Sequence, residues 1–286
     1  MSLKIYILLP VHNRLQSTRK FIESLLGQTL SEYHLVLIDD GSTDGTAEYV
    51  SSRVNSLTII NGRGDWWWGG GLHQGYRWLK KNYVDPKDLV LMINNDTEFG
   101  PDFLQKAMDI LEQNHKTLLL AKVYSKQSNK FFEAGVHANW HRLTFELTDD
   151  PDQINCLSTR GLFLRVVDLM DIGGFHPVLL PHYLSDFEFT IRAHQKGYRL
   201  MADPSLKIMV DESTTGVHHK DRKISRLEFL RDYFSKRSSS NPFYWISLVL
   251  LVCPWGLKPL NFFRVIYGGL VNIFRKTFGV YNQNWR

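Results

Sequence analysis

The run Leu-Val-Leu-Met-Ile at residues 89–93 is followed directly by Asn94, Asn95 and Asp96. Five consecutive apolar residues predict a β-strand that is buried on both faces, as in a parallel sheet between two layers of helices. Open α/β sheets bind ligands at the carboxyl ends of their strands, so this polar cluster is expected to face a ligand crevice. Asp96 is therefore a candidate ligand of Mg²⁺ or Mn²⁺, which would take further ligands from a bound diphosphate. The alternative is a plain turn, since Asn and Asp favour turns.

The same order of strand, polar turn and helix repeats through the first hundred residues. Apolar runs at residues 4–10, 34–38 and 57–60 predict strands, and a polar loop and a helical pattern follow each of them. This order predicts an α/β fold with a mostly parallel central sheet and right-handed crossovers. Farther along, shorter strands are predicted over residues 118–123, 131–134, 140–146 and 161–165. A helix follows with Ser185 as its N-cap, and a last strand lies near residues 199–202.

The net charge of +5 is unevenly distributed along the chain. Residues 220–286 carry twelve Lys and Arg against three acids, whereas the rest carries 22 bases against 26 acids. The apolar stretch that ends before Pro254 is shorter than the roughly twenty residues of a membrane crossing. We therefore expect a basic, amphipathic, helical tail that associates with an anionic membrane surface. Packing of these helices on the catalytic domain or on a second subunit is the alternative.

Other partners and compartments follow from the same features. Nucleic acid is not expected as a partner, because a long apolar stretch has no use on a phosphate backbone. The N-terminal residues lack a secretory pattern, and Cys156 and Cys253 form no Cys-x-x-Cys pair. We expect a cytoplasmic protein that is peripheral on the inner face of the cell membrane. A homo-oligomer is left open.

Four motifs together resemble the family-2 inverting glycosyltransferases of the GT-A fold, of the bacterial cell-surface glycan type. They are residues 9–14 (Leu-Pro-Val-His-Asn-Arg), the acidic turn 39–46, Asn94-Asn95-Asp96 and residues 185–197. The resemblance implies transfer of a sugar from a UDP- or dTDP-linked donor to a growing, lipid-linked glycan. It also implies a catalytic domain over 1–220, with a nucleotide-binding half (1–100) and an acceptor-binding half (101–220). Residues 221–286 are then the tail.

The resemblance assigns a role to individual residues. Asp40 would accept the N3–H of a uracil or thymine, with Pro10, Arg63 and Asn95 beside the nucleotide. Asp186 would be the general base that removes the proton of the acceptor hydroxyl. Ordinary turn chemistry is the alternative for Asp40, and a first-turn acid favoured by the helix dipole is the alternative for Asp186. Glu188 is interpreted as structural, because it faces Arg192 one turn later.

The metal and sugar contacts follow in the same way. Asn94 stands where many family members have an acid, so a further metal ligand beside Asp96 is expected. His218 or His219 is placed to supply it, and solvated loop histidines are the alternative. Candidate contacts to the sugar or the acceptor are Trp67, Trp68, Arg160 and His182. Core packing explains some of the tryptophans, and a surface ion pair is an equal alternative for Arg160.

Two other functions are weighed against this one. A sugar-phosphate nucleotidyltransferase has a related sheet, but it requires a glycine-rich phosphate loop after the first strand. Residues 9–14 contain no glycine, which disfavours that class. A non-catalytic glycan-binding or scaffold protein on the same fold is the rival from another class.

Overall fold

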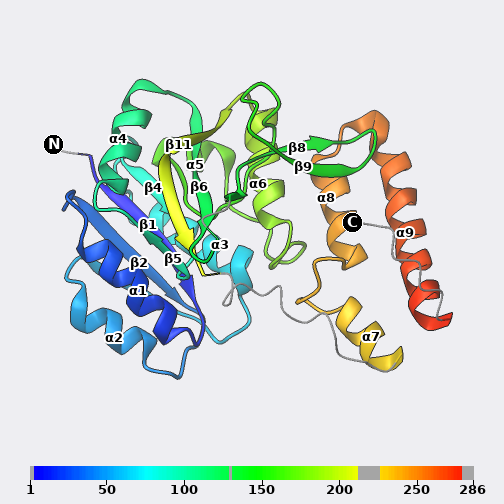
Figure 1. Ribbon diagram of the computed structural model, residues 1–286, viewed down its shortest axis with the longest axis horizontal. Coiled ribbons are helices and arrows are strands. Elements are labelled where there is room, and N and C mark those ends of the chain that lie inside the picture. Colours follow the sequence, from blue (N-terminus) through cyan, green and yellow to red (C-terminus); the bar gives the residue numbers. More distant parts are fainter. Residues whose placement is uncertain (1–2, 129–130, 212–225, 279–286) are drawn as a thin grey trace.

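The structure, a computed structural model, describes residues 3–128, 131–211 and 226–278. Its first part alternates strands and helices, as the sequence predicts (Figure 1). The elements are β1 (Ile5–Val11), α1 (Leu15–Leu26), β2 (Tyr33–Asp39), α2 (Thr46–Arg53), β3 (Leu57–Asn61), α3 (Trp67–Lys81) and β4 (Leu89–Met92). The strands lie in the order β3-β2-β1-β4 and are all parallel. Their carboxyl ends therefore lie at one edge of the sheet.

The sheet continues beyond β4 with strands from later in the chain. These elements are β5 (Thr97–Phe99), α4 (Phe103–Gln113), β6 (Thr117–Ser125), β7 (Phe131–Glu133), β10 (Leu162–Arg165), α5 (Val166–Ile172), α6 (Ser185–Gln195) and β11 (Arg199–Val210). The full order is β3-β2-β1-β4-β10-β6-β11-β5, with β7 paired to β6. β10 is antiparallel to β4 and β6, β5 is antiparallel to β11, and β11 is parallel to β6. The predicted α/β class with a mostly parallel sheet is confirmed.

Two layers of helices cover the two faces of the sheet, and each layer has its own core. On one face the strands pack against α1, α2 and α4, with Phe21 and Leu111 among the fully buried residues. On the other face they pack against α3, α5 and α6, with Leu72 and Phe189 in the core. Side chains alternate between the faces along β1, because successive strand residues point in opposite directions. This three-layer body holds the strand ends rigidly at one edge.

A second, smaller unit lies beside the three-layer body. β8 (Gly135–Asn139) and β9 (Thr144–Thr148) form an antiparallel hairpin. The tail forms α7 (Arg226–Tyr233), α8 (Pro242–Val252), the 3₁₀ helix η1 (Trp255–Leu257) and α9 (Lys258–Phe278). Within the described residues, no helix combines the length and the apolarity that a membrane crossing requires. Figure 1 shows α8 beside the hairpin and α9 on the outer side of α8.

The tail packs on the body through α8. Leu248 and Val252 share a buried cluster with Val136 of the hairpin and Ile191 of α6. The Gln195 side chain also donates a hydrogen bond from Nε2 to the Val252 carbonyl at 2.6 Å. The alternative expectation for these helices, packing on the part of the chain that precedes them, therefore describes α8.

One strand prediction is wrong. The sequence predicts a single strand over residues 140–146, whereas the chain turns back there between β8 and β9. The Asn139 side chain accepts the backbone N–H groups of His141 and Arg142 at 3.0 and 3.1 Å, and Leu143 has a φ of +56°. An Asn side chain that binds the following backbone starts a turn, and this signal outweighs the apolar residues around it.

Candidate active site

A cavity of about 340 Å³ lies at the carboxyl edge of the sheet. Seven of the residues predicted for the site line it: Pro10, Asp40, Trp67, Trp68, Asn95, Asp96 and His182. They come from the ends of β1, β2 and β4, from the first turn of α3 and from the loop before α6. Most of the predicted side chains thus lie together because the carboxyl ends of the strands, where α/β sheets bind ligands, meet at one edge.

Asp40 is held by the backbone of the loop that leads into α3. Its Oδ1 accepts the N–H groups of Gly64 and Asp65 at 2.8 and 3.1 Å. Its Oδ2 accepts those of Trp66 and Trp67 at 2.8 and 3.1 Å. A carboxylate offers about four acceptor positions, and all of them are used here. A contact from Asp40 to a pyrimidine N3–H, as the resemblance implies, would have to displace one of these bonds.

Asp96 is a buried carboxylate with an unused oxygen. Its side chain is 8% exposed, and Oδ2 lies 3.8 Å from Nη1 of Arg14. Its Oδ1 has no hydrogen-bond partner among the described residues. A buried charge without full pairing is costly, so this oxygen suits a cation or a donor from a ligand.

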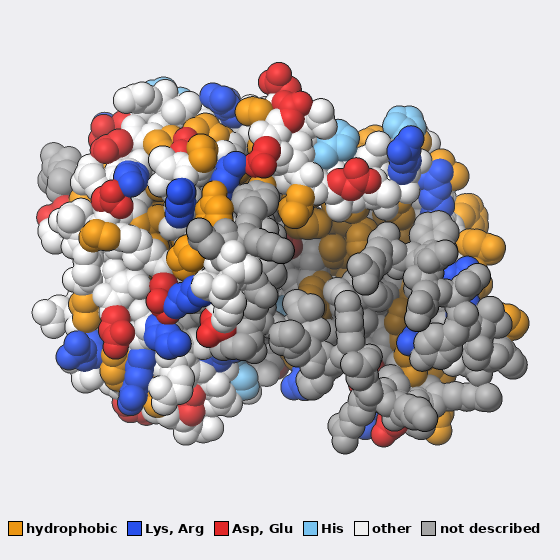
Figure 2. All heavy atoms as spheres, viewed as in Figure 1, with side chains coloured by type: hydrophobic (Ala, Val, Ile, Leu, Met, Phe, Trp, Pro, Cys, Tyr) orange, Lys and Arg blue, Asp and Glu red, His pale blue; other side chains and the backbone are white. Residues whose placement is uncertain are grey.

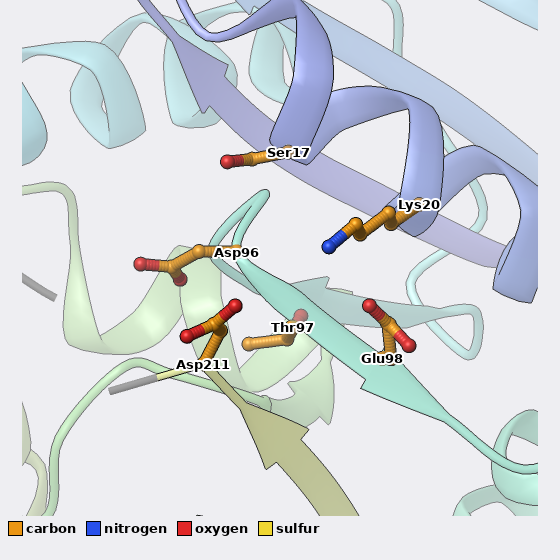
Figure 3. A pocket seen from close by; sticks show the side chains of 6 residues that line it. All are labelled: Ser17, Lys20, Asp96, Thr97, Glu98 and Asp211. Carbon is orange, nitrogen blue, oxygen red and sulfur yellow. The ribbon is translucent and has the colours of Figure 1, made fainter. Parts of the chain in front are cut away.

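Asp96 also borders a second, smaller recess of about 20 Å³ on its other side. The recess is lined by Ser17, Lys20, Asp96, Thr97, Glu98 and Asp211. Figure 3 shows Asp96 and Asp211 on the same side of this recess, with Lys20 and Glu98 on the other. Asp211 follows β11, whose Val210 is paired with Thr97 of β5, so sheet register brings it next to Asp96.

The rest of the predicted metal site lies outside the described residues, because His218 and His219 fall within 212–225. In the part of the chain that is described, no group of three or more His, Cys, Asp or Glu could hold a metal ion. Asp96 is thus the described residue that fits the predicted ion.

Asn95 is placed to shape the cavity wall. Its Nδ2 donates to the Thr18 hydroxyl at 2.9 Å, and that hydroxyl donates to the Arg14 carbonyl at 2.9 Å. His12 contacts the Asp40 carbonyl through Nδ1 at 2.6 Å. These bonds connect the loops after β1, β2 and β4 into one support.

The predicted helix is present as α6, but it begins at Ser185 itself, one residue earlier than a Ser185 cap implies, and Ser185 does not cap it. The hydroxyl of Ser185 donates to the His182 carbonyl at 2.7 Å, and the residue at the cap position is Leu184 with a φ of +65°. Asp186 lies in the first turn of this helix, and its Oδ1 accepts the N–H of Phe187 at 2.9 Å. Asp186 is not among the residues that line the cavity, whereas His182, just before the helix, is.

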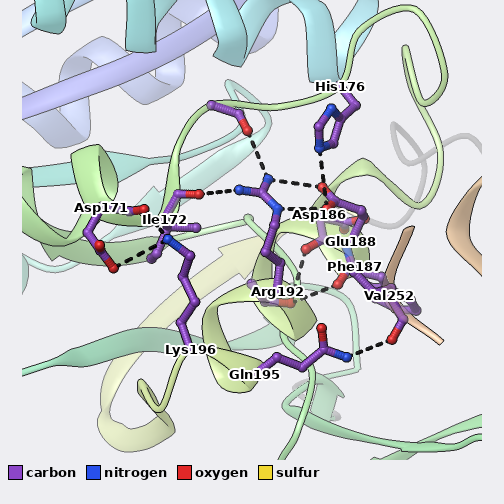
Figure 4. A network of polar contacts seen from close by, with 12 residues as sticks. Asp171, Ile172, His176, Asp186, Phe187, Glu188, Arg192, Gln195, Lys196 and Val252 are labelled. Carbon is purple, nitrogen blue, oxygen red and sulfur yellow. Dashed lines mark hydrogen bonds and ion pairs between the residues drawn. The ribbon is translucent and has the colours of Figure 1, made fainter. Parts of the chain in front are cut away.

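The structural role of Glu188 is confirmed. Its carboxylate is 1% exposed and accepts two bonds from Arg192, at 2.7 Å from Nε and at 3.1 Å from Nη2 (Figure 4). Arg192 also donates to the carbonyls of Ile172 and Gly174. This network fixes α6 against the end of α5 and so fixes the loop that carries His182.

The loop before α6 is docked on the start of α3. The N–H of Gly69 donates to the Pro181 carbonyl at 2.8 Å, and a Cβ on Gly69 would lie 2.6 Å from the Leu180 carbonyl oxygen. The rings of Trp67 and His182 are 5.4 Å apart. Burial lowers the pKa of His182 to about 4, so its ring is neutral at neutral pH. Its Nδ1 has no partner among the described residues.

Two of the predicted contacts, Arg160 and Arg63, are not among the residues that line the cavity. Trp68 is anchored through Nε1 to the Thr159 hydroxyl at 2.9 Å, next to Arg160. Nη1 of Arg160 is buried without a hydrogen-bond partner, and Arg160 pairs with no acid of the described chain. The surface ion pair that was the alternative for Arg160 is therefore not observed. Arg63 is exposed on the loop after β3.

The sequence matches the family description "Glycosyl transferase family 2" over residues 6–169, which is more than half of the chain. The chain belongs to this family. Solved structures of low sequence identity agree with it in fold, and the GT-A prediction is confirmed. No curated protein matches the sequence.

Two proteins of known structure illustrate this similarity in fold. S. aureus TarS 1–349 in complex with UDP-GlcNAc has a TM-score of 0.62 at 18% identity, covering 95% of this chain and 88% of that one. Another TarS structure has a TM-score of 0.60 at 18% identity and covers 99% of this chain, which spans 56% of its length. Mannosyltransferase PcManGT from Pyrobaculum calidifontis, in complex with GDP-Man and Mn²⁺, has a TM-score of 0.56 at 13% identity, covering 90% and 68%.

Two arginines line the cavity of this family-2 glycosyltransferase without having been predicted as site residues: Arg14 and Arg237. Arg14 directly follows the first strand and its loop, so the strand-end rule could have identified it. Arg237 lies in the tail, far from every motif, and no local pattern marks it.

Proposed function

We propose that this glycosyltransferase transfers a sugar from a UDP- or dTDP-linked donor to a growing, lipid-linked cell-surface glycan, with inversion at the sugar carbon. The observation that carries the proposal is the buried Asp96 carboxylate with its unpaired Oδ1 beside a cavity of about 340 Å³. Cavities of this size hold small-molecule ligands. TarS in complex with UDP-GlcNAc and PcManGT in complex with GDP-Man support a nucleotide sugar as the donor.

The nucleotide would lie along the carboxyl ends of β1, β2 and β4. Pro10 and Asn95 border the cavity there, and Arg63 on the adjoining loop would reach the phosphates. We assign Asp40 to holding residues 64–67, so that this loop forms one wall of the nucleotide site. The division into a catalytic domain (1–220) and a tail (221–286) is part of the same proposal.

Asp96 is the residue that we propose as a ligand of Mn²⁺ or Mg²⁺, with His218 as a second. Hard cations take carboxylate oxygens, and the unpaired Oδ1 of Asp96 is of that kind. The Asp211 carboxylate in the adjoining recess adds negative charge that favours a cation. A divalent ion bound there would neutralise charge on the diphosphate as it leaves.

Asp186 is proposed as the general base. It would remove the proton of the acceptor hydroxyl while that oxygen attacks the anomeric carbon from the face opposite the diphosphate. The bond from that carbon to the phosphate oxygen breaks, and its electron pair leaves with the nucleoside diphosphate. Inversion requires one base and no covalent intermediate. The position of Asp186 at the start of α6, directly after the cavity-lining loop of His182, supports this role.

The aromatic side chains are proposed as sugar contacts. Trp67 and Trp68 present apolar faces near the cavity, and such faces stack on sugar rings. Neutral His182 offers Nδ1 to a sugar or acceptor hydroxyl. Arg160, which follows the Thr159 bonded to Trp68, would contact the transferred sugar through its unpaired Nη1.

We further propose that α9 rests on an anionic membrane at the inner face of the cell, which would bring the lipid-linked acceptor to the site. Its exposed apolar residues recur every three or four positions and so form one stripe: Leu260, Phe263, Tyr267, Leu270 and Phe274. Figure 2 shows hydrophobic and basic side chains together along the right edge, where α9 runs. Residues 233–278 contain six Lys and Arg and no acid. A second copy on this face would oppose like charges, whereas anionic lipid complements them.

Nucleotide release from UDP-, dTDP- and GDP-sugars, with and without a chelator, tests the enzymatic proposal. Asp186→Asn should keep UDP binding and lose transfer by about 10²–10⁴-fold, the usual range for a general base. Asp152→Asn, an exposed acid after β9, is the matched control and should keep full activity. Wild-type turnover in Asp186→Asn would remove that residue from the mechanism. Absence of nucleotide release with every donor would favour the non-catalytic glycan-binding alternative, and formation of a nucleotide sugar from a sugar phosphate would favour the nucleotidyltransferase.

A further inference from the structure

The segment between α7 and α8 brings a tail residue to the catalytic cavity. Arg237 lies in this segment and lines the cavity together with Asp96 and His182. Its guanidinium carbon is 5.9 Å from the centre of the Trp67 ring at the start of α3. In Figure 1 the turn between α7 and α8 accordingly points toward α3.

This segment is anchored by folded parts of the tail. Asn241 is 2% exposed, and its Nδ2 donates to the carbonyls of Phe234 and Ser235 at 3.0 and 3.2 Å. Its Oδ1 accepts the N–H of Phe243 at 3.0 Å and so caps α8. The Trp245 indole donates to the Ser239 carbonyl at 3.0 Å. Because α8 packs into the body, the position of Arg237 is set by the fold.

The charges that line the cavity single out Arg237. The Asp40 carboxylate already accepts four backbone N–H groups, and Nη1 of Arg14 lies 3.8 Å from Oδ2 of Asp96. Arg237 has no carboxylate partner among the described residues, and its guanidinium lies over the face of the Trp67 ring. A cation–π contact at an exposed site is a weak restraint, so an anion in the cavity can recruit the guanidinium.

We propose that Arg237 binds the diphosphate of the donor and of the nucleoside diphosphate product, so that the tail completes the active site. A guanidinium presents a planar set of donors that matches phosphate oxygens in a bidentate way. Negative charge grows on the diphosphate as the bond to the sugar breaks, and a fixed cation stabilises that charge most in the transition state. The inference rests on the proposed function, since it takes a nucleoside diphosphate as the ligand.

One consequence concerns the extent of the catalytic unit. The family match ends at residue 169, and Arg237 lies well beyond it. The tail would therefore have two roles, a membrane-facing surface on α9 and a phosphate-binding side chain between α7 and α8. Placement of the tail and donor binding would then depend on each other.

The test compares UDP with uridine, which has the same base and sugar and no phosphate. Binding of both probes to the full chain is measured by calorimetry for the wild type, Arg237→Gln, Arg237→Lys and the control Lys236→Gln. Lys236 is exposed, carries the same charge one residue earlier and does not line the cavity. We expect Arg237→Gln to raise the Kd of UDP by about ten- to a hundred-fold, the range for hydrogen bonds to a charged group. Uridine binding should stay unchanged, Arg237→Lys should be intermediate, and Lys236→Gln should match the wild type.

Each other outcome has a distinct meaning. Equal weakening of UDP and uridine in Arg237→Gln would make Arg237 a residue that only shapes the cavity, and the proposal would fail. Unchanged UDP binding in Arg237→Gln would also overturn it, with the proposed function intact. A wild type that binds neither UDP nor dTDP nor GDP would refute the proposed function itself, and this inference with it.

Discussion

Replacement of Asp40 by asparagine tests whether this residue holds the loop of residues 64–67 or contacts the pyrimidine N3–H of the donor. In the structure, Oδ2 accepts the N–H groups of Trp66 and Trp67, and Oδ1 accepts two more from the same loop. An amide NH₂ in place of Oδ2 would face two donors and leave both without an acceptor. Each such loss costs about 1–3 kcal/mol, and we expect Asp40→Asn to lower the free energy of unfolding by about 3 kcal/mol in total. In a chain of 286 residues that lowers Tm by about 5 °C.

The assay is thermal and urea unfolding without ligand, followed by UDP titration of the folded variant. Asp65→Asn removes one carboxylate charge from the loop that Asp40 holds, and the Asp65 carboxylate makes none of these bonds, so this variant should unfold like the wild type. The reasoning is refuted if Asp40→Asn keeps the wild-type Tm. A normal Tm with a selective loss of UDP affinity would instead support the implied contact to the pyrimidine N3–H.

Three further expectations concern other parts of the molecule. Gly69→Ala should destabilise the protein by about 1–3 kcal/mol, because its Cβ would meet the Leu180 carbonyl oxygen at 2.6 Å. Gly268→Ala should instead stabilise the protein by up to about 1 kcal/mol, because a Cβ at this position in α9 meets nothing within 4 Å. Equal changes in the free energy of urea unfolding for the two variants would contradict this expectation. The unfolded chain takes up a proton near pH 6.5 that His182 takes up only near pH 4, so stability is lost as the pH falls between these values. Relative to His182→Gln, the wild type should lose about 3 kcal/mol from pH 7 to pH 4, and parallel pH profiles would exclude this. Phe263→Glu should weaken binding to phosphatidylglycerol vesicles while Tyr83→Glu, an exposed aromatic on the body, should not; loss of a dimer instead would assign the stripe to a second copy.

Much of the site follows from local sequence. Asn95 and Asp96 were identified because they follow a buried strand, whose end is visible as a change from apolar to polar residues, whereas Pro10 was assigned by the resemblance to the family. A parallel sheet then brings these ends to one edge, whatever the details of packing. The pairing of Glu188 with Arg192 was equally accessible, since one helical turn separates the two residues.

The other contacts depend on residues that are distant in sequence. Asp40 bonds to backbone groups 24–27 residues away, and an acidic turn does not reveal which donors will reach it. Arg237 meets Trp67 across 170 residues, through a tail whose place is set by the packing of α8. Asp186 was placed by family pattern, and the structure confirms the helix but leaves Asp186 outside the cavity lining. Tertiary packing determines such contacts, and local sequence patterns do not reveal it.

The glycines of α3 indicate what the sequence specifies at this site. Glycine inside a helix costs about 1 kcal/mol relative to alanine, yet Gly71 and Gly75 are both buried in α3. A Cβ on Gly75 would lie 2.9 Å from Leu8 Cδ1 and 3.0 Å from Ile38 Cδ1, and one on Gly71 would lie 3.2 Å from Pro10 Cβ. These glycines therefore let α3 lie closer to β1 and β2 than a helix of ordinary residues could. The glycines therefore serve to position α3 and not to stabilise it as a helix. The close approach brings the first turn of α3, with Trp67, to the strand ends where Asp40 and Pro10 line the cavity.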